Sequence, residues 1–118
     1  MTNNQNASHS FHVYEVAKEL ARASRSLIER IEKRDRPLAD QARRAIQSVI
    51  LNVREGNRRV GRDRLHGFRI AAGSADELVG ALDVAEVMGY LAAADLAAPF
   101  ALADRVLAML YRLANPRR

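Results

Sequence analysis

The sequence predicts an all-α protein folded as an up-down-up-down antiparallel four-helix bundle. Of its 118 residues, 48% are hydrophobic and only 5% are aromatic, and the abundance of Ala, Leu, Arg and Glu favours helix over sheet. Apolar side chains recur at helical spacing in four segments, and Pro or Gly residues stand between those segments. Four helices joined by short connections place sequence neighbours antiparallel. A chain of this length forms one domain with a substantial core.

The first helix is expected over residues 11–34. Its apolar stripe consists of Val13, Val16, Ala17, Leu20, Ala23, Leu27, Ile28 and Ile31. The polar and uncharged residues 1–10 that precede it are expected to form a disordered N-terminal tail.

A second helix is expected to start at Pro37, because proline cannot sit inside a helix but suits its first turn. We expect this helix to continue to about Gly56 or Arg59. Residues 56–61 then form a turn in which glycine adopts the left-handed backbone conformation.

A third helix is expected from Asp63 to Met88, where Gly89 ends it. Small residues fill positions 71–75 of this helix. Gly73 among them costs about 1 kcal/mol relative to Ala in a helix interior, which suggests close backbone approach by another helix.

A fourth helix is expected to have Asp95 as its N-cap and Pro99 in its first turn. Its end is expected at the Asn-Pro pair at 115–116. The bundle domain therefore spans residues 11–115, and residues 116–118 form a basic C-terminal tail.

The third and fourth helices carry more apolar surface than a monomeric bundle can bury. Their apolar arcs are roughly twice as wide as the ~100° stripe of a surface helix. We therefore expect copies of the chain to associate through these two helices. The alternative is that some of the residues, alanines especially, are exposed good helix formers. The residues are Phe68, Ile70, Ala71, Ala75, Leu78, Val79, Ala81, Leu82, Val84, Ala85 and Met88, and then Leu96, Phe100, Leu102, Val106, Leu107, Met109, Leu110, Tyr111 and Leu113.

A polar stripe follows one flank of the apolar face of the second helix. An ordinary solvated face does not require such an ordered row, so we interpret the stripe as a hydrogen-bonded network or an interface and not as an active site. Its residues are Gln41, Arg44, Ser48, Asn52 and Glu55.

Charge is segregated along the chain. The net charge is +5, yet residues 30–69 carry twelve basic and five acidic groups, whereas residues 70–104 carry six acids and no Lys or Arg. Such a distribution favours either a polyanion-binding face or contact between basic and acidic segments of adjacent subunits.

Arginines on or just after the outer face of the second helix are the candidate nucleic-acid-binding residues. Arginine outnumbers lysine 17 to 2, and its planar fork suits bidentate phosphate contact. No aromatic residues interleave with them for base stacking, so we expect contact with backbone phosphates. The alternative is a solubilising or inter-subunit charged face. The candidates are Arg43, Arg54, Arg58, Arg59, Arg62 and Arg64.

No sequence signal indicates catalysis, a metal or a cofactor. His9 and His12 have the i,i+3 spacing of a metal pair, but we interpret them as part of a solvated terminus, and His66 has no acidic cluster at ligand spacing. The chain has no Cys, no nucleophile elbow and no phosphate-binding glycine loop. No apolar run is long enough to cross a membrane, and the N-terminus has no signal-peptide segment, so we expect a cytoplasmic protein.

Three stretches together resemble a known family. They are LADQARRAIQSVILNVREG from Leu38, FRIAAGSADEL from Phe68, and Gly-Tyr-Leu at 89–91. The chain over residues 11–113 is similar to the four-helix bundle proteins of the ribosomal-RNA intervening-sequence type, small bacterial proteins of which some are encoded by insertions within large-subunit ribosomal RNA genes. The pairing of Asn-x-x-Glu-Gly at 52–56 with Ile-Ala-x-Gly-Ser at 70–74 is the most specific part of the resemblance.

The resemblance implies assembly and no enzymatic activity. The family includes the accessory protein of diversity-generating retroelements, which forms a pentameric ring with a basic surface and binds nucleic acid and a reverse transcriptase. The five residues of the polar stripe match the family's polar positions. The sequence departs at Ile50, where members often carry proline, so we expect a more regular second helix.

The sequence therefore predicts a non-enzymatic, ring-forming homo-oligomer, a pentamer by resemblance, whose arginine-rich surface binds the phosphate backbone of RNA or DNA. The alternative is a scaffold or adaptor that binds a protein partner and uses its charges between subunits.

Overall fold

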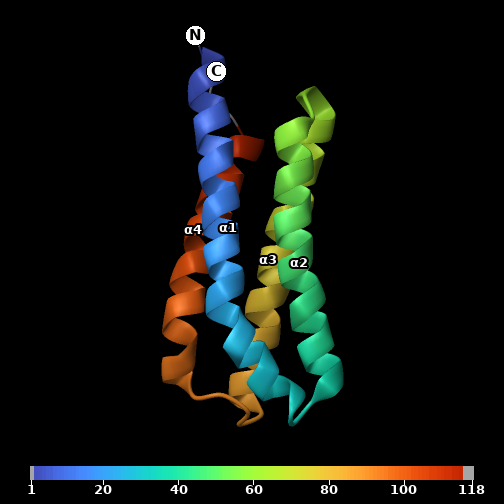
Figure 1. Ribbon diagram of the computed structural model, residues 1–118, viewed down its shortest axis with the longest axis vertical. Helices are drawn as coiled ribbons and strands as arrows, with labels where there is room; N and C mark the ends of the chain where they lie inside the picture. The colour runs from blue at the N-terminus through green and yellow to red at the C-terminus, as the bar shows by residue number, and fades with distance from the viewer. Residues whose placement is uncertain (1, 116–118) are drawn as a thin grey trace.

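Four long helices form an elongated bundle in the computed structural model, which describes the backbone of residues 2–115 and the side chains of residues 10–115 (Figure 1). They are α1 (Thr2–Glu32), α2 (Arg36–Arg58), α3 (Gly61–Val87) and α4 (Ala97–Ala114), with a short 3₁₀ helix η1 (Ala93–Leu96) before α4. Each long helix packs against its two neighbours around the bundle, α1 closing the circle with α4. The predicted all-α up-down four-helix bundle is confirmed.

Helix α1 is longer than expected. It begins at Thr2 instead of near Phe11, so the backbone of residues 2–10, expected as a tail, continues the helix. Helix α2 runs without interruption through Ile50, in line with the absence of a proline there. The basic tail predicted for residues 116–118 lies outside the described residues.

Apolar side chains from all four helices fill the interior. The predicted stripe of α1 is buried except for Ala23, which is half-buried. The largest fully buried side chains include Phe68 and Leu78 of α3, Leu20 of α1 and Leu110 of α4. Burying a side chain of this size contributes about 1.5–3 kcal/mol, so this core is the main source of stability.

Asp35 joins the two connections at one end of the bundle. Its Oδ1 accepts a hydrogen bond from the Leu38 amide at 3.1 Å, which caps α2, and Pro37 lies in the first turn as predicted. Its Oδ2 accepts a hydrogen bond from the Tyr90 hydroxyl at 3.2 Å, just after Gly89 (φ +80°) ends α3. Desolvation and the nearby Asp35 carboxylate raise the pKa of Tyr90.

The connection between α2 and α3 is shorter than the turn predicted over residues 56–61, and α2 ends close to Arg59, the later of its two expected ends. Helix α2 continues to Arg58, and the left-handed glycine of the connection is Gly61 (φ +60°). Gly56 lies inside α2 against α3, where a Cβ atom would come within 2.6 Å of Cε1 of the Phe68 ring. A Cβ on Gly67 of α3 would lie 3.2 Å from the Cα of Gly56, so these two glycines let the helix backbones approach closely.

The predicted cap of α4 was wrong. The Asp95 Oδ2 accepts a hydrogen bond from the Ala92 amide at 2.8 Å and so stabilises η1, while α4 begins at Ala97. Pro99 is in the first turn of α4, as expected. The Ala92 amide and then the hydrogen-bonded Arg30 guanidinium, 3.2 Å away, lower the pKa of Asp95.

The apolar surplus is confined mainly to α3 and its C-cap. Its exposed members are Ile70, Val84, Val87 and Met88. On α4 only Tyr111 is an exposed large apolar side chain, because the other predicted ones pack at least partly against the core. The expected close approach at Gly73 is not made within the described chain, since a Cβ there would meet no atom within 4 Å.

Candidate nucleic-acid interface

The centre of the polar stripe forms a hydrogen-bonded network between α2 and α3. The Ser48 Oγ lies 2.7 Å from the Ser74 Oγ of α3. The Asn52 Nδ2 donates to the Ser48 carbonyl oxygen at 2.9 Å and to the Ser48 Oγ at 3.1 Å. A hydroxyl group both donates and accepts, so this set satisfies polar atoms at a half-buried helix contact. Sequence reasoning identified Ser74 as a small residue and as part of the motif at 70–74, and missed it as the partner of Ser48.

The ends of the stripe have different surroundings. Gln41 and Arg44 line a polar groove of about 410 Å³ between α2 and α3, together with Ser48, Ser74 and Glu77 among its lining residues. Among the described residues, the hydrogen bonds of the two serine hydroxyls are to each other and to the Asn52 side chain.

Glu55, at the other end of the stripe, forms an ion pair with Arg59 at 3.3 Å, and both side chains are more than half exposed. Such exposed pairs contribute at most about 1 kcal/mol. Glu55 therefore stands outside the serine–asparagine network.

Three of the six candidate arginines are engaged within the chain. Arg43 binds Glu32 at 2.6 Å and Asp40 at 3.0 Å, which joins α2 to the end of α1. Arg59 is paired with Glu55. Arg64 turns inward. The guanidinium groups of these three arginines therefore already have intramolecular partners.

The Arg64 side chain folds back onto the end of α2. Its Nη1 donates to the Gly56 carbonyl oxygen at 3.3 Å, near the C-terminus of α2. Its guanidinium lies 4.9 Å from the centroid of the Phe68 ring. Burial lowers the pKa of Arg64. Its assignment to the phosphate-binding residues stays a prediction, and spacing alone does not show that the side chain folds back onto α2.

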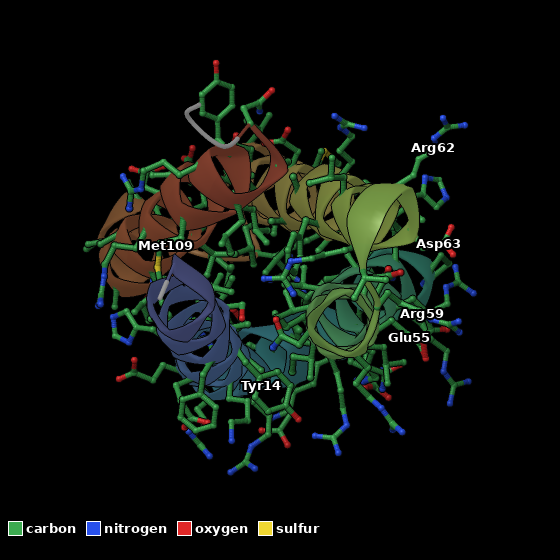
Figure 2. All side chains as sticks on the ribbon, turned by 90° about the horizontal axis from the view of Figure 1, so that it is seen from above. Tyr14, Glu55, Arg59, Arg62, Asp63 and Met109 are labelled. Carbon is green, nitrogen blue, oxygen red and sulfur yellow. The ribbon has the colours of Figure 1, made fainter. Side chains whose placement is uncertain are left out.

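The other three candidates, Arg54, Arg58 and Arg62, are exposed and have no carboxylate partner among the described residues. They lie on the last two turns of α2 and the first turn of α3, and Figure 2 shows Arg62 at the outer side of this end of the bundle. Their uncompensated positive charges can bind phosphate oxygens without first breaking an ion pair.

An aromatic residue that the sequence did not connect with these arginines lies beside one of them, Arg54. The Tyr14 ring of α1 has the Lys18 Nζ at 4.8 Å and the Arg54 Cζ at 5.8 Å from its centroid. Figure 2 places Tyr14 on the outer side of the bundle where α1 and α2 meet. Arg54 therefore has an aromatic neighbour that the sequence did not indicate. Tyr14 and Arg54 are 40 positions apart and meet only through helix pairing.

The described residues include no cluster of three or more His, Asp or Glu side chains that could hold a metal ion. None of the described helices combines the length and the hydropathy that crossing a bilayer requires.

Fold and site together define a small four-helix bundle protein with a polar α2–α3 contact and an arginine-bearing outer face. The chain belongs to the 23S rRNA-intervening sequence protein family, whose family model matches residues 9–112. The resemblance drawn from the three sequence stretches is thereby confirmed. Comparison with curated proteins and with solved structures gives no match.

Proposed function

We propose that this protein is a non-enzymatic homo-oligomer that binds the phosphate backbone of RNA or DNA through Arg54, Arg58 and Arg62. The observation that supports this most directly is the exposure of these three arginines without a described carboxylate partner. Residues 70–104, by contrast, contain no cation. Positive charges that are concentrated in one part of the chain create a positive electrostatic potential, which attracts polyanions to that part of the surface.

Self-association is supported by the outer face of α3. Ile70, Val84 and Val87 are exposed there by 39%, 47% and 78%. The exposed Glu77 lies two turns from both Ile70 and Val84 on the same side of α3, and the exposed Asp76 and Asp83 lie beside it. Exposed apolar side chains interspersed with carboxylates can pair with apolar and basic residues of another copy of the chain. A closed ring of five subunits is the specific form that the family resemblance implies.

A salt titration of nucleic-acid binding tests the first part of the proposal. If three phosphates are contacted per protomer, the logarithm of the association constant falls with the logarithm of salt concentration with a slope of about −2.7 on duplex DNA. The double variant Arg58→Ala/Arg62→Ala should bind more weakly and reduce that slope by about 2.

The matched control is Arg105→Ala/Arg112→Ala, which removes the same charge from exposed positions on α4. It should leave the slope unchanged if binding is located on α2 and α3. Equal loss in both double variants would show that only net charge matters. No binding to either nucleic acid at low salt would refute this part and favour the alternative, a scaffold or adaptor for a protein partner.

Light scattering at micromolar protomer concentration tests assembly. Val84→Glu should reduce the measured mass, because it buries a carboxylate in the proposed contact. Val60→Glu is the control, since Val60 is 84% exposed in the α2–α3 turn and away from that surface. A monomeric wild-type protein would end the assembly proposal.

A further inference from the structure

We propose that Phe11 and Tyr14 of α1 form a base-stacking platform, so that the ligand of the basic face is single-stranded RNA or DNA. This inference rests on the proposed nucleic-acid binding and specifies its substrate class. The two rings are here called the aromatic pair.

The ring of Tyr14 is held between two helices by cations. Lys18 of α1 and Arg54 of α2 lie 4.8 and 5.8 Å from its centroid, within the range of cation–π attraction. Glu15 pairs with Lys18 at 2.9 Å, whereas Arg54 has no carboxylate partner among the described residues. The ring is half-buried, so its orientation is restricted while part of it stays accessible.

Phe11 extends this surface by one turn. It precedes Tyr14 by three residues, so the two side chains project from the same side of α1 and are separated by about 4.5 Å along the helix axis. Phe11 is 63% exposed. A single exposed phenylalanine is ordinary. Phe11 differs from an isolated exposed phenylalanine because its ring lies one turn from Tyr14, which is within cation–π range of Arg54.

The charge around the aromatic pair favours nucleic acid over a second copy of the chain as its occupant. Helical spacing places the exposed Arg22 and Arg25 on the outer side of α1 together with the exposed Glu29, and the neighbouring α2 adds the exposed Arg54 and Arg58. Aromatic rings bind bases that are free to leave their own stack, and duplex bases are not. The aromatic pair therefore selects single strands, while the arginines bind the phosphates of either form.

The test compares a single-stranded oligonucleotide of about 12 nucleotides, within the usual site size, with a duplex of the same length. Phe11→Leu keeps an apolar side chain at an exposed position and removes the ring. It should weaken single-strand binding by about 5- to 140-fold, the equivalent of about 1–3 kcal/mol per stacked base. Duplex binding should stay unchanged. Tyr111→Leu is the matched control, since Tyr111 is a 69% exposed aromatic residue on α4.

Tyrosine fluorescence gives a direct readout. The chain has three tyrosines and no tryptophan, so Tyr90→Phe/Tyr111→Phe leaves Tyr14 as the only tyrosine. Its emission should be quenched by the single strand and not by the duplex. Tyr14→Leu should lose single-strand preference, whereas Tyr14→Phe, which keeps a ring, should retain it.

The outcomes separate the two proposals. Duplex binding with the expected salt slope, combined with equal single-strand affinity of Phe11→Leu and wild type, overturns the aromatic pair and leaves the proposed function standing. Absence of binding to both ligands at low salt overturns both. A fall in oligomeric mass on Phe11→Leu would assign the aromatic pair to a contact between copies and overturn this inference.

Discussion

Gly56→Ala should destabilise the bundle, whereas the same substitution at Gly73 should stabilise it. Both positions lie inside helices, so Ala adds about 1 kcal/mol of helix propensity at each. At Gly73 the new methyl group meets nothing within 4 Å. At Gly56 it would lie 2.6 and 2.7 Å from two ring atoms of Phe68, which is fully buried. The Phe68 ring therefore has to move, or α2 and α3 have to separate.

The difference between the two variants isolates the packing effect, because the propensity contribution cancels. Overpacking a core costs about 1–3 kcal/mol. At about 2.1 cal/mol/K of unfolding entropy per residue, a chain of 118 residues changes its melting temperature by about 4 °C per kcal/mol. Gly56→Ala should therefore melt about 4–12 °C below Gly73→Ala.

Thermal unfolding followed by circular dichroism at one protomer concentration measures this difference, since assembly makes the melting temperature concentration-dependent. Gly80→Ala is a second control because a Cβ there also meets no atom within 4 Å. Light scattering on each variant separates a change in assembly from a change in helix packing. A Gly56→Ala protein that melts with or above Gly73→Ala would refute the close approach of α2 and α3.

Two further predictions concern the end of α2 and the entry to α4. Arg64→Met should lower the free energy of unfolding by about 1 kcal/mol, measured in urea, because it removes the hydrogen bond to the Gly56 carbonyl oxygen, and it should leave nucleic-acid affinity unchanged. A loss of affinity without a loss of stability would instead return Arg64 to the phosphate-binding set. Asp95 has its pKa lowered in the folded state by the Ala92 amide and Arg30, so its stabilising contribution is present above the unfolded value near 3.8 and is lost as pH falls through the folded value. The stability difference between wild type and Asp95→Asn should therefore shrink below about pH 4 in acid-unfolding measurements, and a difference that stays constant with pH would contradict this assignment.

The sequence alone determined the helices and most of their limits, because these depend on residues within one or two turns of each other. The apolar period of residues 13–31 predicted the buried face of α1, and Pro37 predicted the start of α2. Family membership was also readable, since the three motif stretches are continuous in the chain. Local signals left the end of α2 open between Gly56 and Arg59, because a glycine suits a turn and a helix contact equally well.

The tertiary structure alone decided which polar side chains meet. Ser48 and Ser74 are 26 positions apart, and neither carries a local signal of its partner. The same holds for Tyr14 and Arg54, which meet because α1 and α2 pair in one register and rotation. Helical periodicity gives the direction in which a residue projects from the axis of its helix, but it does not show which neighbouring helix packs on that side. That choice follows from how the four apolar faces pack together, and it separates the engaged arginines from the free ones.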